Sequence, residues 1–179
     1  LGDHCLGEIL GDEMPIYKKG KIPEQKYFER LIKERYGGDY KEAHDNYVNF
    51  FKHLALIIET ENGIIISHAG PIHNFDAGQV NPKSFINIFK EGYGNENKEL
   101  RQMLWNRFGD QFIIKGKGYD REDLEKFLFS MNAKVMVVGH TPCKGYSIHE
   151  NQMVVDSHSR GNKSGYLVVD LTDENVTIE

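Results

Sequence analysis

Cysteine is scarce in this chain of 179 residues, where only Cys5 and Cys143 occur. Such a pair cannot build the disulfide framework of a small secreted domain, so a reducing compartment, the cytoplasm, is favoured. Long hydrophobic runs are also lacking, because no apolar stretch approaches the roughly 20 residues that cross a bilayer. Positive charge is not in excess either, since the formal net charge is −5. We therefore expect no nucleic acid and no membrane among the main partners.

Three short histidine motifs flanked by small residues stand out in what the sequence does contain. They are Gly2-Asp3-His4, Ser67-His68-Ala69-Gly70-Pro71 and Gly139-His140-Thr141-Pro142. The second motif follows the apolar run 64–66 and the third follows the apolar run 135–138, and such runs are typical of buried strands. Each strand is expected to deliver its histidine to the carboxyl edge of a sheet, where open α/β sheets build their ligand sites.

Asp3, His68 and His140 are the candidate ligands of a metal ion. Imidazole nitrogens and carboxylate oxygens suit borderline and hard divalent ions, among them manganese, iron, zinc and cobalt. A single histidine is more often a hydrogen-bonded core or surface residue than a ligand. Three such side chains, each presented from a turn of small residues, favour the metal site instead.

The pattern of apolar residues predicts a mainly helical front of the chain and a mainly β tail. The predicted helices cover residues 23–36, 39–52, 83–92, 97–107 and 121–131, the last of them capped by Asp120. The predicted strands cover residues 54–59, 63–67, 134–138, 145–149, 152–156, 165–170 and 174–178. Asn62-Gly63, between the first two strands, is typical of a hairpin turn.

The motifs together resemble those of the calcineurin-like metallophosphoesterases, in the branch of the serine/threonine phosphoprotein phosphatases and their bacterial and archaeal relatives. That family carries, in order, Asp-x-His, Gly-Asp-x-x-Asp-Arg-Gly, Gly-Asn-His-Glu, His-Gly/Ala-Gly and Gly-His-x-x. Here Gly2-Asp3-His4-Cys5 resembles the third motif, His68-Ala69-Gly70-Pro71 the fourth and Gly139-His140-Thr141-Pro142 the fifth. Met103-Leu104-Trp105-Asn106 is similar to the Leu-Trp-Ser-Asp stretch between the last two. The first two motifs have no counterpart, so we expect residues 1–179 to form a single domain that lacks its N-terminal portion.

The resemblance implies an α/β fold in which two mixed β-sheets pack face to face and are flanked by helices. Residues 12–52 have no counterpart in the family pattern and are interpreted as a helical insertion. The third motif departs from the pattern, because Asp3 stands where the family has asparagine and Cys5 where it has glutamate. Aspartate remains a competent oxygen ligand, whereas the missing glutamate removes an acceptor that would orient its neighbours.

The resemblance also implies a role for each candidate site residue. It makes Asp3, His68 and His140 the ligands of the second ion in a two-metal site, and it makes His4 the acid that protonates the leaving-group oxygen. The candidate residues for binding the substrate phosphate are Arg107, Arg121 and His158.

The implied function is the hydrolysis of phosphomonoesters, such as phosphoserine and phosphothreonine, by a metal-bound hydroxide. The implied partner is a phosphorylated protein or a small phosphate ester. Two alternatives stay open. One is a dinucleoside polyphosphate hydrolase, which uses the same chemistry. The other is a degenerate, non-catalytic binding domain of the same fold, which Asp3, Cys5 and the missing motifs favour.

Overall fold

The computed structural model describes residues 1–10, 18–19, 22–71, 98–109, 118–157 and 163–178. The helix expected at residues 83–92 and the candidate phosphate-binding residue His158 lie outside these ranges. The remaining helices and strands expected from the sequence can be compared with the structure directly.

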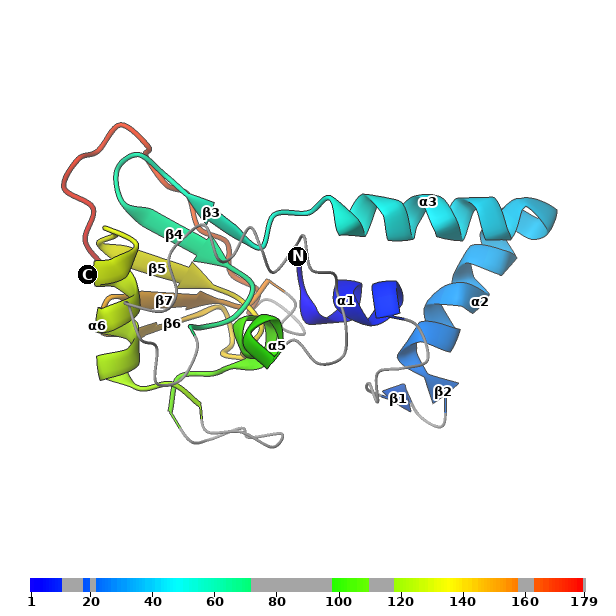
Figure 1. The fold of residues 1–179 in the computed structure, drawn as a ribbon, viewed down its shortest axis with the longest axis horizontal. Helices are drawn as coiled ribbons and strands as arrows, with labels where there is room; N and C mark the ends of the chain where they lie inside the picture. Colours follow the sequence, from blue (N-terminus) through cyan, green and yellow to red (C-terminus); the bar gives the residue numbers. More distant parts are fainter. Residues whose placement is uncertain (11–17, 20–21, 72–97, 110–117, 158–162, 179) are drawn as a thin grey trace.

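A five-stranded mixed sheet forms the centre of the fold (Figure 1). Its strands, in spatial order, are β3 (Ile57–Glu59), β4 (Ile64–Ser67), β5 (Val135–Val138), β7 (Gln152–Val155) and β6 (Tyr146–His149). The three central strands β4, β5 and β7 run parallel, and each edge strand pairs antiparallel with its neighbour. The carboxyl ends of β4 and β5 therefore lie side by side.

The turn between β3 and β4 confirms the expected hairpin. Gly63 adopts a positive φ of 89°, a backbone conformation that glycine reaches without steric cost. The Thr60 hydroxyl donates a hydrogen bond to Asn62 Oδ1 over 2.7 Å, which closes the turn. The hairpin delivers the polypeptide from β4 directly into the second histidine motif.

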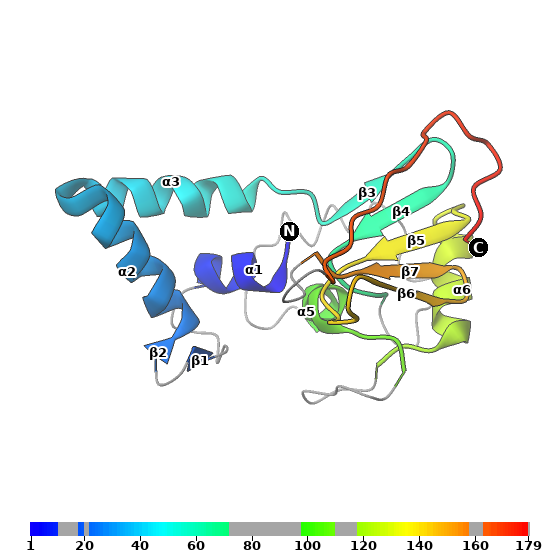
Figure 2. The same ribbon diagram turned by 180° about the vertical axis from the view of Figure 1, so that it is seen from behind.

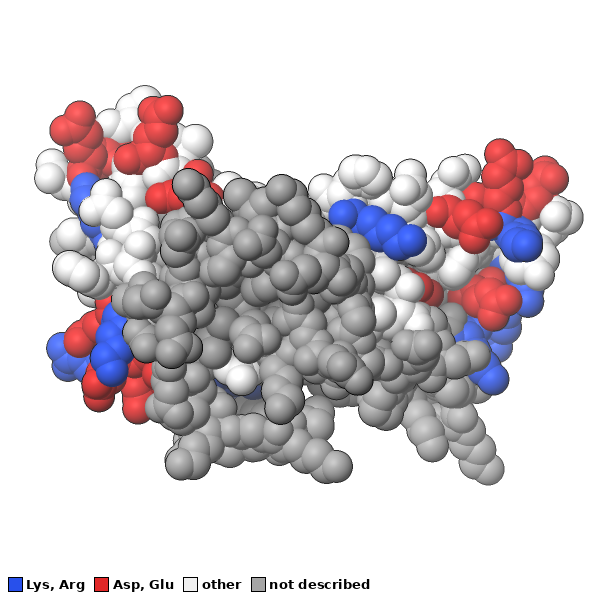
Figure 3. Space-filling model, viewed as in Figure 1, with Lys and Arg blue, Asp and Glu red and all other residues white. Residues whose placement is uncertain are grey.

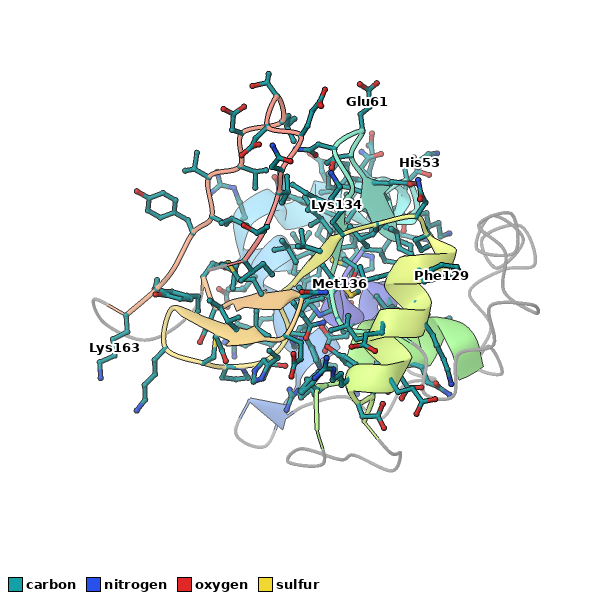
Figure 4. All side chains as sticks on the ribbon, turned by 90° about the vertical axis from the view of Figure 1, so that its left-hand side faces the viewer. His53, Glu61, Phe129, Lys134, Met136 and Lys163 are labelled. Carbon is teal, nitrogen blue, oxygen red and sulfur yellow. The ribbon has the colours of Figure 1, made fainter. Side chains whose placement is uncertain are left out.

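Helices cover one face of the sheet and bury the main core. Helix α6 (Arg121–Ser130) begins at Asp120, whose side chain accepts a hydrogen bond from the Asp123 backbone, as the sequence predicted. Met136 on β5 lies beside α6, whereas Phe129 on α6 is 85% exposed (Figure 4). Helix α5 (Lys98–Trp105) packs into the same core. The buried core residues are Leu6, Leu56, Ile65, Met103, Leu104, Tyr119, Leu124, Phe127, Leu128, Met131, Met136, Val138 and Val154.

The C-terminal tail runs along the other face of the sheet, past Ile64, Val135 and Val137 (Figure 2). The expected strands at 165–170 and 174–178 are wrong, because these residues have no regular secondary structure. The tail is held by side-chain hydrogen bonds and not by pairing as a strand of the sheet. The Asn62 amide donates hydrogen bonds to the backbone oxygens of Asp170 and Asp173, over 3.2 and 3.0 Å. The apolar and β-branched residues alone predicted strands there, but a strand also requires a neighbouring backbone with which to pair.

A helical hairpin projects from the sheet on the side of the N-terminus (Figure 1). It consists of α2 (Glu24–Tyr36), a 3-10 turn (Gly37–Asp39) and α3 (Tyr40–Lys52), which confirms both helices expected there. A short strand pair, β1 (Lys18–Lys19) and β2 (Ile22–Pro23), precedes α2. Acidic and basic side chains are interspersed over the hairpin (Figure 3).

The α/β class expected from the sequence is confirmed by this mixed sheet and its flanking helices. Within the described ranges there is one large sheet, and the facing sheet of the expected pair is not found among them. None of the helices in these ranges has both the length and the apolar character that crossing a membrane requires.

Candidate metal centre

Asp3 is the first residue of helix α1 (Asp3–Leu10), and its side chain is only 2% exposed. Leu6, one turn later, is 1% exposed and packs into the core, so the first turn of α1 is fixed against the body of the protein. A carboxylate in the first turn also interacts favourably with the positive end of the helix dipole. The helix thereby holds a buried, negatively charged group at a defined place.

His68 follows the last residue of β4 directly, as the sequence predicted. The hydroxyl of Ser67 donates a hydrogen bond to the backbone oxygen of Ala69 over 2.6 Å, which tightens the turn around His68. A Cβ atom at Gly2 would lie 3.1 Å from Nδ1 of His68. The lack of a side chain at Gly2 therefore allows the first and second motifs to approach closely.

His140 follows β5 and Gly139, and its backbone is in the left-handed region with a φ of 59°. A residue other than glycine pays roughly 1 kcal/mol or more for this conformation, and such strain occurs often at functional sites. The Gly139 amide donates a hydrogen bond to the backbone oxygen of His68 over 3.0 Å. This bond ties the two histidine turns together at the carboxyl edge of the sheet.

The three side chains converge on one point. His68 Nε2 lies 2.8 Å from Asp3 Oδ1, and His140 Nδ1 lies 3.4 Å from Asp3 Oδ2. The two imidazole nitrogens are 3.2 Å apart. One donor atom of each residue thus lies within 4.8 Å of the others. The expected cluster of Asp3, His68 and His140 is present.

The pKa of the Asp3 carboxyl reflects two opposing influences. Burial by itself raises this pKa, because it disfavours the charged form. The close imidazoles of His140 and then His68 lower it by favouring the carboxylate form, and they outweigh burial, so the pKa falls well below its ordinary value. Asp3 is therefore ionised at neutral pH and available as an anionic ligand.

These donors fit a divalent cation. Ligand atoms about 2.1 Å from an ion are separated by roughly 3.0 Å in octahedral and 3.4 Å in tetrahedral coordination, close to the three distances seen here. Asp3 Oδ1 is buried, and its short contact with His68 is not aligned as a hydrogen bond. A buried carboxylate oxygen without a hydrogen-bond donor normally carries a large free-energy cost. A cation bound by the three side chains would remove that cost.

Two further candidate residues lie beside this cluster. His4 is 56% exposed, and its Nε2 atom is 3.9 Å from Asp3 Oδ1. It thus faces solvent next to the candidate cation position. Arg107 is partly buried, and its Nη2 atom donates a hydrogen bond to the backbone oxygen of His140 over 3.4 Å. The guanidinium is therefore close to the third histidine motif.

Arg121 is not brought to the cluster. It is exposed on the first turn of α6, and its ion pairs are with Glu125 at 2.7 Å and Glu150 at 3.6 Å. Glu150 lies in the turn before β7, at the amino edge of the parallel strands, whereas the candidate metal ligands lie at the carboxyl edge.

One supporting interaction of the site escaped the sequence interpretation. The Tyr119 hydroxyl donates a hydrogen bond to Gln152 Oε1 over 2.6 Å, and both residues are buried. A Cβ atom at Gly70 would lie 1.8 Å from Tyr119 Cε1, so this ring packs directly on the second histidine motif. The sequence offers no local signal for this pair, because its members are 33 residues apart on different elements.

Comparison with solved structures finds a similar protein, whereas comparison with family models and with curated proteins finds none. No protein-family model matches the chain, and no curated protein matches it. Among solved structures, the fold is similar to a protein serine/threonine phosphatase from Saccharomyces cerevisiae that has similarity to human phosphatase PP5. The match has a TM-score of 0.59 at 16% sequence identity and covers 73% of this chain. The chain spans 43% of that phosphatase chain, and the likeness shows a shared fold.

Proposed function

We propose that this protein is a metal-dependent phosphoesterase, and that it hydrolyses phosphomonoesters such as phosphoserine or phosphothreonine. The observation that carries the proposal is the convergence of Asp3, His68 and His140, from three distant parts of the chain, within 4.8 Å. The similarity in fold to a serine/threonine phosphatase supports the same chemistry. Together they favour phosphoryl transfer to water over other reactions of a histidine–carboxylate metal site.

In this proposal the three converging side chains hold the divalent cation. The ion, manganese, iron, zinc or cobalt, supplies activation of water and neutralisation of charge on the phosphate oxygens. Asp3 contributes the negative charge of the site, and His68 and His140 contribute nitrogen donors. The buried carboxylate and the strained His140 turn keep these donors in place before the cation arrives.

His4 and Arg107 act on the substrate in this proposal. His4 is exposed beside the ligands, so its imidazole is placed to give a proton to the departing alkoxide oxygen. Arg107 lies against the His140 turn, where its guanidinium is able to bind phosphate oxygens. His158 stays a prediction from the sequence as a further phosphate-binding residue, whereas Arg121, which pairs with glutamates at the opposite edge of the sheet, is given no role in this proposal.

The test is a combined measurement of metal content and phosphatase activity. The chain is dialysed against Mn²⁺, analysed for bound metal, and assayed with p-nitrophenyl phosphate, phosphopeptides and dinucleoside polyphosphates. The proposal predicts bound Mn²⁺ and release of phosphate from monoesters, both reduced in His140→Ala. A preference for the dinucleotides would assign the alternative substrate class. Bound metal with no hydrolysis of any substrate would favour the non-catalytic domain. Asp3 and Cys5 in the third motif also favour that alternative.

A further inference from the structure

Asn106 lies directly after α5 and contacts the turn that carries His68. Its backbone oxygen accepts a hydrogen bond from the Gly70 amide over 3.2 Å. Its side-chain Nδ2 donates a hydrogen bond to the backbone oxygen of Pro71 over 2.8 Å. One residue therefore engages both a donor and an acceptor of the backbone, two and three positions after the metal ligand.

Asn106 is itself held from the protein core. The backbone N–H of Asn106 donates a hydrogen bond to the backbone oxygen of Gln102 over 2.8 Å, which continues the helical pattern of α5 by one residue. Met103 and Leu104, on the last turn of α5, are fully buried. The hydrogen bonds to the His68 turn are thus made from a rigid support rather than from a free loop.

The same turn is fixed by a second, independent contact. The Tyr119 ring occupies the space where a side chain at position 70 would lie, and its hydroxyl is bonded to buried Gln152. Gly70 is therefore confined by a hydrogen bond from one segment and by an aromatic ring from another. Little freedom remains for the backbone that follows His68.

The residue after Asn106 contacts the other histidine turn, through the hydrogen bond from Arg107 to the His140 oxygen. Two consecutive residues thus link the turns of both histidine ligands to the end of α5. We propose that Asn106 is a positioning residue of the metal centre, which fixes the His68 turn so that Nε2 points toward Asp3. The inference rests on the proposed function, because it concerns the same three ligands.

The test compares Co²⁺ binding by Asn106→Leu, wild type and the matched control Asn46→Leu, which makes the same change on the exposed face of α3. Leucine has a shape close to that of asparagine but no N–H donor for Pro71. Loss of a group that orients a ligand typically weakens metal binding about 10- to 100-fold, and we expect a loss in that range. The d–d absorption bands of Co²⁺, which report coordination geometry, should also change in Asn106→Leu alone. Affinity within about twofold of wild type, with unchanged bands, would overturn the proposal.

Asn106→Asp keeps the size of the side chain and serves if the leucine variant does not fold. It also lacks the N–H donor, but its negative charge by itself favours a nearby cation. Weaker Co²⁺ binding by this variant therefore cannot come from charge and would support the positioning role. Equal or tighter binding together with unchanged Co²⁺ d–d bands would contradict it.

Amide hydrogen exchange in the metal-free chain separates this inference from the proposed function. If wild type takes up no Co²⁺, the proposed metal site is wrong. The rate of exchange at the Gly70 amide still shows whether Asn106 fixes the turn. In Asn106→Leu the Gly70 amide keeps its acceptor, the backbone oxygen of residue 106, and the turn loses the side-chain hydrogen bond to Pro71. If that side-chain bond fixes the turn, exchange at Gly70 should be roughly 5- to 10-fold faster than in wild type, the effect of losing about one hydrogen bond. Unchanged exchange there would show that Asn106 does not fix the turn.

Discussion

Removing the negative charge of Asp3 should weaken cation binding more than any other change of equal size. Asp3→Asn keeps the shape of the side chain and one oxygen ligand, so it isolates the charge. The Asp3 side chain is 2% exposed, and its two oxygens lie 2.8 and 3.4 Å from the imidazole nitrogens of His68 and His140. The substitution therefore acts on an interaction that water screens only weakly.

The size of the effect follows from Coulomb's law. Two unit charges 4 Å apart interact by about 1 kcal/mol in water and by about 4 kcal/mol at the effective permittivity of a protein site. A divalent cation held by Asp3 would carry twice this charge and lie nearer than 4 Å, while the cost of taking both ions out of water offsets part of the gain, so we take about 3 kcal/mol as a lower estimate. This corresponds to a dissociation constant for Co²⁺ that is roughly 100-fold larger in Asp3→Asn.

Isothermal titration with Co²⁺ at neutral pH measures this difference. Asp45→Asn is the matched control, since it removes the same charge from an aspartate that is 69% exposed on α3. The control should bind Co²⁺ as wild type does, because exposed charges are screened by water and salt. An affinity of Asp3→Asn within about threefold of wild type would refute the reasoning.

Three further predictions concern catalysis and stability. His4→Ala should lower the turnover of p-nitrophenyl phosphate about 100-fold or more while the Mn²⁺ content stays unchanged, and a parallel loss of metal would instead make His4 a ligand. Gly70→Ala should destabilise the chain by roughly 1–3 kcal/mol in urea unfolding, because the new Cβ would meet Tyr119 at 1.8 Å; an unchanged midpoint would contradict that packing. Because the pKa of Asp3 is lowered in the folded chain, this residue contributes stability above the unfolded value of about 3.9 that is lost as the pH falls. Metal-free wild type should therefore lose more unfolding free energy between about pH 5 and 2 than Asp3→Asn, and equal losses would speak against the lowered pKa.

Much of the candidate site could be predicted from the sequence because the local signals agree with the topology. An apolar run that ends in Ser67 or Gly139 predicts a buried strand followed by a turn. When two such strands are parallel neighbours, the histidines that follow them must lie side by side. β4 and β5 are such neighbours, and the hydrogen bond from Gly139 to the His68 oxygen joins their ends.

Other features could not be predicted, because they depend on contacts between distant segments. The apolar run 166–169 of the tail is typical of a strand, yet it has no regular secondary structure, and Val168 is 80% exposed. The packing of Tyr119 on Gly70 and the hydrogen bonds of Asn106 arise only once α5 and the sheet have come together. Local patterns therefore predicted the three candidate ligands, and tertiary packing determines how they are supported.

The most direct test of the metal site is the anomalous scattering of crystals grown with Co²⁺. We predict an anomalous peak about 2.0–2.2 Å from a carboxylate oxygen of Asp3, from His68 Nε2 and from His140 Nδ1. Absence of a peak between these three side chains, in crystals that show ordered density for all of them, would contradict the account.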